Sequence, residues 1–113
     1  MAATANLTID QGATFSSDIT VKDNAGNPLD LTDYTASAKM ALGYSSTRTR
    51  VTMTTAFASD RTTGILTISL TADQTNTLSA PARYLYDVEI TASDSTVTRV
   101  IEGIITVNPS ITT

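Results

Sequence analysis

The chain has 113 residues, a length that suits one ordinary domain with a real hydrophobic core. It contains no cysteine, histidine or tryptophan, which excludes disulfides, thiolate zinc sites and the commonest general base. Its seven basic residues are scattered among eleven acidic ones, and the formal net charge of −4 argues against a nucleic-acid partner. No apolar run approaches the roughly 18 residues that cross a bilayer, so we expect no membrane partner.

We therefore expect a single domain over residues 1–113, with flexible tails at 1–5 and 109–113, and we expect no cofactor and no metal. Apolar residues alternate with polar ones in short runs from Leu7 to Val107, separated by turns rich in Asp, Asn, Gly and Pro. Such alternation is typical of strands that bury one face. Threonine, which favours strands, makes up about a fifth of the chain.

Antiparallel sheets packed face to face would bury these faces. The predicted fold is therefore all-β: a two-sheet antiparallel β-sandwich, Ig-like, with about seven strands and at most one short helix. In chain order, the predicted strands cover residues 7–9, 15–21, 36–42, 48–55, 65–70, 84–90 and 97–107. Thr71 and Gln74 have the spacing of a capping box, which predicts the short helix over 72–78. We expect the last two strands to form a β-hairpin.

The inward positions of these strands define a predicted core. It consists of Phe15, Ile19, Val21, Met40, Leu66, Ile68, Tyr84, Tyr86, Val88, Ile90, Ile101 and Ile105. The third predicted strand also directs Leu42 inward. The last strand carries apolar residues on both faces, so we expect it to be central in its sheet or covered by a partner.

Two groups of acidic residues could carry chemistry. Asp87 and Glu89 share the outer face of the sixth strand, where a carboxylate pair could act as acid and base or bind a cation. A solvated strand face opposite Arg99 or Glu102 is the alternative, and the high frequency of exposed charge favours it. The loop 23–27 superficially resembles a calcium loop but lacks the later bidentate Glu, which favours a plain turn.

Four residues are candidate partner contacts: Arg48, Arg50, Val100 and Ile104. The two arginines share one face of the predicted fourth strand, where they could bind an acidic partner. Alternatively, their charge could simply prevent an edge strand from pairing with another chain. The two apolar residues belong to the two-sided last strand. No histidine or nearby lysine completes a nucleophile–base pair with any serine, so we expect no catalytic residue and no enzyme activity.

Several motifs follow one another in an order that resembles structural proteins of tailed bacteriophages. They lie in residues 7–15, 21–36, 65–75, 82–90 and 97–103. The first two read I-x-Q-G-x-T-F and V-K-D-x-x-G-x-P-x-D-L-T-x-Y-x-A. This pattern covers nearly the whole chain and is similar to the N-terminal β-sandwich of phage baseplate upper proteins, which attaches appendages to the virion.

The resemblance implies a non-enzymatic virion structural protein, an attachment or assembly module of the tail, baseplate or neck. Its partners would be other virion proteins, and it would be a homo-oligomer or present in many copies in a symmetric particle. It would be made in the host cytoplasm and located in the virion. The nearest alternative is a capsid decoration protein that stabilises the outer shell. A ligand- or carbohydrate-binding β-sandwich module is more distant, because aromatic residues are few.

Overall fold

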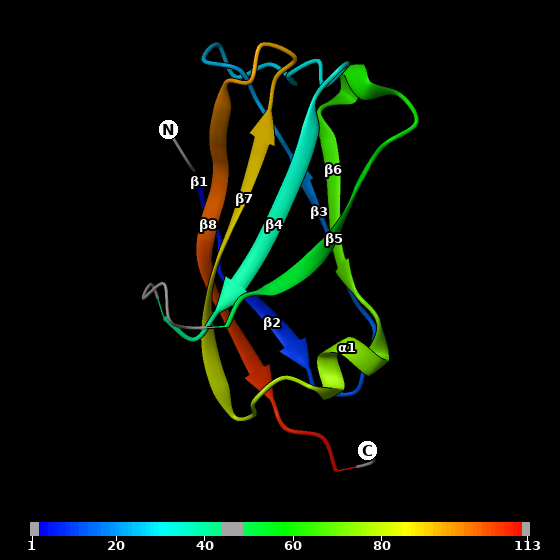
Figure 1. Ribbon diagram of the computed structural model, residues 1–113. Coiled ribbons are helices and arrows are strands. Elements are labelled where there is room, and N and C mark those ends of the chain that lie inside the picture. Colours follow the sequence, from blue (N-terminus) through cyan, green and yellow to red (C-terminus); the bar gives the residue numbers. More distant parts are fainter. Residues whose placement is uncertain (1–2, 44–48, 112–113) are drawn as a thin grey trace.

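The computed structural model describes residues 3–43 and 49–111. Its strands are β1 (Ala3–Thr4), β2 (Leu7–Asp10), β3 (Phe15–Thr20), β4 (Thr35–Ala41), β5 (Val51–Phe57), β6 (Ile65–Leu70), β7 (Ala82–Thr91) and β8 (Val97–Asn108). In this described part of the chain, the helical elements are a 3-10 turn, Arg61–Thr63, and one short helix, α1 (Ala72–Asn76) (Figure 1). The prediction of an all-β protein with very little helix is confirmed.

All eight strands belong to one mixed sheet, in the order β1–β8–β7–β4–β5–β6–β3, with β2 also paired to β8. The predicted two-sheet antiparallel β-sandwich is therefore wrong, because a single sheet curls into an open half-barrel. The curl passes through β5, whose residues 51–53 pair with β4 while residues 54–57 pair with β6. Alternation along a strand reports which face is buried, and it is the same for two stacked sheets and for one bent sheet.

The first two strands also depart from an antiparallel arrangement. β1 and β2 run parallel to β8, with Ala3 opposite Ile101 and Leu7 opposite Ile105. Part of the segment predicted to be a flexible tail thus belongs to the sheet. Between the two strands, the backbone N–H of Ala5 donates to the carbonyl of Glu102 at 2.9 Å. This pairing joins the beginning of the chain to its last strand, which local alternation cannot reveal.

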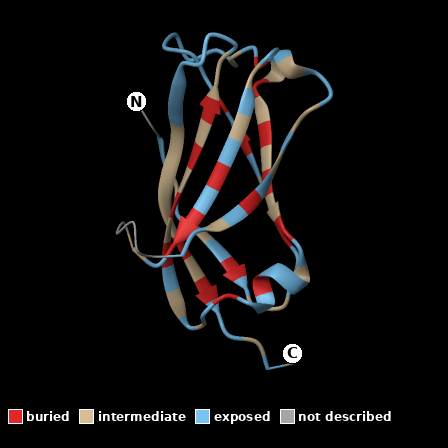
Figure 2. Ribbon diagram, viewed as in Figure 1, coloured by how far each residue is buried: buried red, intermediate tan, exposed pale blue. Residues whose placement is uncertain are grey.

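The core fills the space between the two halves of the curled sheet, where buried and exposed positions alternate along each strand (Figure 2). Of the twelve predicted core residues, all are buried except Ile101, which is half-buried. Leu42, predicted to point inward, is 44% exposed because it lies beyond the end of β4. The core also contains Ile9, Leu31, Met53, Leu70, Leu78 and Val107.

The connection from β3 to β4 crosses one end of the half-barrel and buries Leu31 completely. Arg61 holds this connection in place, because its Nη1 donates to the carbonyls of Leu31 at 3.2 Å and Tyr34 at 3.1 Å. The guanidinium carbon of Arg61 also lies 4.0 Å from the centre of the Phe57 ring. A cation over an aromatic face adds a favourable contact to these hydrogen bonds.

The helix α1 lies at the opposite end. Its predicted capping box is present: Thr71 Oγ1 accepts from the N–H of Gln74, whose Oε1 accepts from the N–H of Thr71. Thr75 is completely buried; its Oγ1 accepts from the N–H of Gly12 at 3.0 Å and donates to the carbonyl of Ala13 at 2.8 Å. One side chain therefore joins the helix to the turn between β2 and β3.

Candidate functional site

The four predicted partner contacts do not form one surface. Arg48 lies outside the described residues. Arg50 lies just before β5, an interior strand between β4 and β6, so protection of a sheet edge does not explain its charge. Val100 lies at a bulge, where Val88 pairs with Ile101 and the next β7 residue pairs with Arg99, and it packs against the core.

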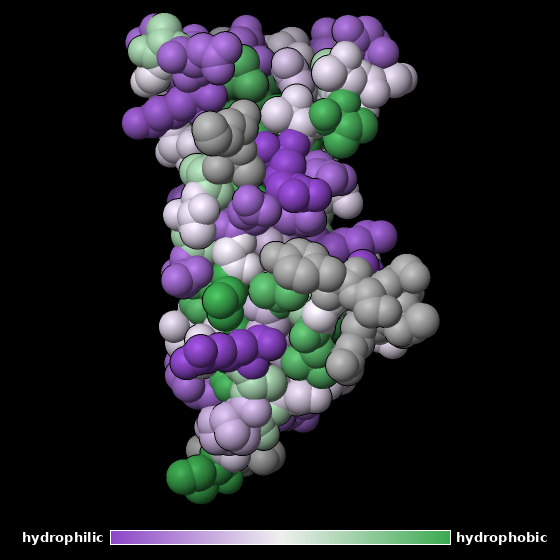
Figure 3. Space-filling view, turned by 90° about the vertical axis from the view of Figure 1, so that its left-hand side faces the viewer, coloured by the Kyte–Doolittle hydropathy of each residue, from purple (hydrophilic) through white to green (hydrophobic). Residues whose placement is uncertain are grey.

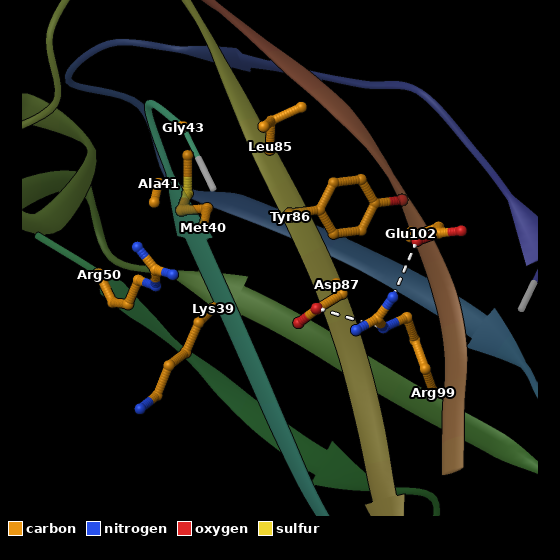
Figure 4. A pocket seen from close by; sticks show the side chains of 10 residues that line it. All are labelled: Lys39, Met40, Ala41, Gly43, Arg50, Leu85, Tyr86, Asp87, Arg99 and Glu102. Carbon is orange, nitrogen blue, oxygen red and sulfur yellow. Dashed lines mark hydrogen bonds and ion pairs between the residues drawn. The ribbon is translucent and has the colours of Figure 1, made fainter. Parts of the chain in front are cut away.

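Ile104, the fourth residue, is half-buried on the outer face of β8, opposite Leu85 of β7. Two of the four predictions, Arg50 and Ile104, therefore lie at or beside one surface feature. This feature is a shallow hollow of about 210 Å³ on the outer face of the sheet, where β4, β7 and β8 meet the start of β5 (Figure 4). We call it the outer hollow. It is lined by Lys39, Met40, Ala41, Gly43, Arg50, Leu85, Tyr86, Asp87, Arg99 and Glu102.

The register of three strands builds the outer hollow. Lys39 of β4 is opposite Asp87 of β7, and Asp87 is opposite Glu102 of β8. Each of the three alternates along its strand with residues that point toward the core, so their side chains form a charged row on the outer face. This row was missed by the sequence analysis, because its members become neighbours only when the pairing of all three strands is known.

Arg99 bridges the two carboxylates of this row. Its Nε lies 3.4 Å from Oδ2 of Asp87, and its Nη1 lies 3.3 Å from Oε1 of Glu102. The side chain of Arg99 is 50% exposed, so both ion pairs are screened by water and each contributes roughly 0–1 kcal/mol to stability. Asp87 is thus a solvated residue paired across the hairpin, as the plainer interpretation of the Asp87/Glu89 pair expected.

The opposite side of the outer hollow is cationic. Lys39 is exposed, and it forms no hydrogen bond or ion pair with the described part of the chain. Arg50 lies beyond it toward β5, as Figure 4 shows. Among the described residues, three cations and two carboxylates line the outer hollow.

The floor of the outer hollow is tied to the beginning of the chain. The ring of Tyr86 is buried in the sheet, and its hydroxyl donates to the carbonyl of Ala5 at 2.7 Å. Burial raises the pKa of Tyr86, so the hydroxyl keeps its proton for this bond. Gly103 allows the approach, because a Cβ at that position would lie 2.0 Å from the same carbonyl oxygen.

The loop 23–27 is a turn and not a calcium loop. Oδ1 of Asp23 accepts from the N–H groups of Ala25 at 2.9 Å and Asn27 at 3.0 Å, so this carboxylate caps its own backbone. Within residues 3–43 and 49–111, no three His, Cys, Asp or Glu side chains gather closely enough to hold a metal ion.

The surface over β8 is mainly polar, with a small group of apolar side chains between polar rows (Figure 3). This distribution agrees with a strand whose outer face meets water along most of its length. Across the described segments, no helix has the length and apolar character needed to span a membrane.

No family model matches the chain, and no curated protein matches it. Among solved structures, it is similar to an internalin-like protein of Listeria monocytogenes, with 18% sequence identity and a TM-score of 0.46. The match covers 95% of this chain and 28% of that protein, so the chain spans less than a third of its length. A likeness at this level carries no functional inference.

Proposed function

We propose that this chain is a non-enzymatic structural protein of a tailed-bacteriophage virion, an attachment or assembly module of the tail, baseplate or neck. The observation that carries the proposal is the ordered set of motifs along nearly the whole chain, which resembles phage baseplate upper proteins. The positions of the motif residues support it, because these residues close and align the sheet. Motifs whose residues stabilise the fold suit a protein with a structural role.

The first motif fastens one end of the half-barrel. Gln11 Nε2 donates to the carbonyl of Leu78 at 2.9 Å, and Gln11 Oε1 accepts from the N–H of Ser110 at 3.2 Å. The N–H of Gly12 donates to Thr75 at 3.0 Å. The Gln-Gly pair therefore joins the turn after β2 to α1, to the segment that follows α1 and to the segment that follows β8.

The second motif acts on the opposite end, and the last two motifs act on the link between β1 and β2. Leu31, in the Asp-Leu-Thr segment of the second motif, is completely buried at that end, and the Arg61 side chain donates to its carbonyl. Tyr86 and Gly103, in the last two motifs, receive the carbonyl of Ala5. The resemblance thus includes residues that fasten both ends of the half-barrel and the link between β1 and β2.

Two surfaces suit contacts with neighbouring virion proteins. One is the outer hollow with its mixed charges. The other is β3, which ends the strand order and has only β6 as a partner among the described strands. Backbone groups on such an edge can accept a strand from another chain.

The test is mass spectrometry of gradient-purified particles from the phage that encodes the chain. We expect the protein in the particle fraction in multiple copies relative to the portal protein, with abundant non-structural phage proteins as the negative control. Absence from particles, with presence in the infected-cell lysate, would refute the virion proposal. Antibody labelling of intact particles then locates the protein, and labelling on the head instead of the tail would favour capsid decoration.

A further inference from the structure

We propose that the free edge of β3 pairs with the β3 edge of a second copy of the chain, antiparallel and around a two-fold axis at Ser17. The inference deepens the proposed function and rests on it for the many copies that a particle brings together. The pairing itself follows from the backbone and the side chains of β3. They form an edge that is open, unprotected and complementary to itself.

The backbone groups of every second residue of β3 point away from β6. The N–H of Val21, just after β3, donates to the carbonyl of Gly64 at 2.7 Å, and hydrogen-bonded pairs alternate along an antiparallel ladder. The carbonyl of Ile65, opposite Thr20, accepts instead from the N–H of Ala58 on the β5 side at 3.1 Å. Three residues therefore direct their N–H and C=O groups to the free edge, where these groups form no hydrogen bond with the described part of the chain: Ser16, Asp18 and Thr20.

This edge lacks the features that keep edge strands from pairing with other chains. β3 has six residues, with no proline, lysine or arginine, and its register with β6 contains no bulge. Its one charged residue, Asp18, is held over the sheet, because its Oδ1 accepts from the hydroxyl of Thr67 in β6 at 2.7 Å. At the other end of the strand order, β1 and β2 are only two and four residues long, and short strands protect an edge. The edge of β3 is therefore the one that can receive a strand.

The residues of this edge are arranged symmetrically about Ser17, which selects a second copy as the occupant. Two antiparallel copies of β3 centred there place Phe15 opposite Ile19 on the inner face, and aromatic and β-branched residues pair well across strands. One strand thus supplies both halves of a two-fold interface. The matching pairs are Thr14 with Thr20, Phe15 with Ile19, and Ser16 with Asp18.

Asp18 decides between the registers that two copies of β3 can adopt. A slip by one residue would set inward positions against outward ones, so only registers that keep the two faces aligned remain. The next such register is centred on Asp18 and would place two carboxylates directly opposite each other, which destabilises a sheet. The interface is small, so we expect a weak dimer in solution that becomes stronger between neighbouring copies held in a particle.

The first test introduces a cysteine, since the chain contains none. In the proposed register, Ser17 faces Ser17 of the second copy in a non-hydrogen-bonded pair, whose Cα atoms lie about 4.5 Å apart, within the reach of a disulfide. Ser17→Cys should therefore form a disulfide-linked dimer with oxidised glutathione, visible on a non-reducing gel.

Thr20→Cys is the matched control for this cross-link. Thr20 is more exposed than Ser17, but its two copies would lie about 20 Å apart along the paired strands. Thr20→Cys should therefore cross-link at least tenfold more slowly. Equal or faster cross-linking of the control would overturn the proposed register.

The second test measures hydrogen exchange of the edge amides in the wild-type chain. As the chain concentration rises toward about 1 mM, the amides of Asp18 and Thr20 should exchange at least twofold more slowly, whereas that of Ile19, already bonded to β6, should not change. Ser16→Pro removes an N–H from the free edge and should abolish this dependence, whereas Ser16→Ala keeps the N–H and should retain it. Exchange that does not depend on the concentration of the wild-type chain would refute the pairing.

Particles separate this inference from the proposed function. If the wild-type chain is absent from particles, the virion proposal fails, and the tests on the purified chain still decide the pairing. If the chain is present but those tests fail, only the pairing is refuted. Particles that carry Ser17→Cys should yield the same dimer on oxidation, and a cross-link to a different virion protein would overturn the assignment to a second copy.

Discussion

The two ends of the half-barrel are closed by different kinds of hydrogen bond. At the end that carries α1, the bonds join residues far apart in the chain: Gln11 bonds Leu78, 67 positions away, and Ser110, 99 positions away. At the other end (upper part of Figure 1), the turns bond mainly to themselves. Four aspartates there accept from backbone N–H groups two to four residues further on: Asp23, Asp30, Asp60 and Asp94.

Three of these turns repeat one pattern, Asp-x-Thr, which the sequence analysis did not notice. Asp30 and Asp60 each accept from both the N–H and the hydroxyl of the threonine two residues on. The turns are exposed, so water replaces these bonds easily when they break. Thr75 at the other end is wholly buried, and nothing replaces its bonds. Local turns of this kind can be recognised in the sequence, whereas hydrogen bonds between distant segments, such as those of Gln11 and Thr75, cannot.

A substitution in the core, between the two ends, should have the largest effect on the free energy of unfolding. Ile68 is completely buried in the middle of β6, and Ile68→Ala should lower the free energy of unfolding by about 2–5 kcal/mol, because it removes apolar contacts and leaves a cavity. Urea denaturation followed by circular dichroism measures the change. A loss well below 1 kcal/mol would show that neither end depends on this part of the core.

Thr75→Val should have the next largest effect, a loss of about 1–3 kcal/mol. Valine keeps the shape but leaves the N–H of Gly12 and the carbonyl of Ala13 without their buried partner. The matched control is Thr62→Val in the exposed turn of the opposite end, where the loss should stay within about 0.5 kcal/mol. Equal losses in the two variants would contradict the distinction between the ends.

Arg61→Lys weakens a long-range tie of the turn-rich end, the pair of hydrogen bonds from the Arg61 side chain to the connection between β3 and β4, and we expect a loss of about 1–2 kcal/mol. Lysine keeps the charge but cannot reach two carbonyl oxygens with a planar group or stack over the Phe57 ring as arginine does. The altered connection should also speed hydrogen exchange at Leu31, whose N–H donates to the carbonyl of Arg61. Unchanged exchange at Leu31 would show that Arg61 does not hold the connection.

The smallest effect concerns pH. Hydrogen bonds from Thr32 and Thr62 lower the pKa values of Asp30 and Asp60 below the ordinary 3.8, with the threonine hydroxyl as the larger cause in each. A folded-state pKa below the unfolded value means that the stabilisation is complete above about pH 4 and is lost as pH falls through the lower folded-state pKa. Asp60→Asn should therefore flatten the decline of stability as the pH falls below about 4. A decline as steep as in the wild-type chain would refute a contribution from this turn.

Apart from β1, which was expected to be part of a flexible tail, the strands and α1 could be predicted from the sequence, because alternation, the Thr71/Gln74 capping box and the final hairpin are local signals. The curl of the sheet could not, since it depends on β5 changing partners partway along its length. The same limit applied to the candidate site. Arg50 and Ile104 were singled out by charge and hydropathy, but the bulge turned Val100 to the core, and Lys39 gained its neighbours only through the register of three strands.

The parallel pairing of β1 and β2 with β8 should make the molecule resist a pulling force applied along these strands. β1 begins toward one end of the half-barrel and β8 finishes toward the other (Figure 1). A force that pulls the first and last strands apart along their axes would slide β2 against β8. The backbone hydrogen bonds of this pairing, from Leu7 opposite Ile105 to Asp10 opposite Asn108, would then be loaded together in shear. Bonds loaded together resist more than bonds peeled one at a time, so the chain can bear tension between its ends without a covalent cross-link.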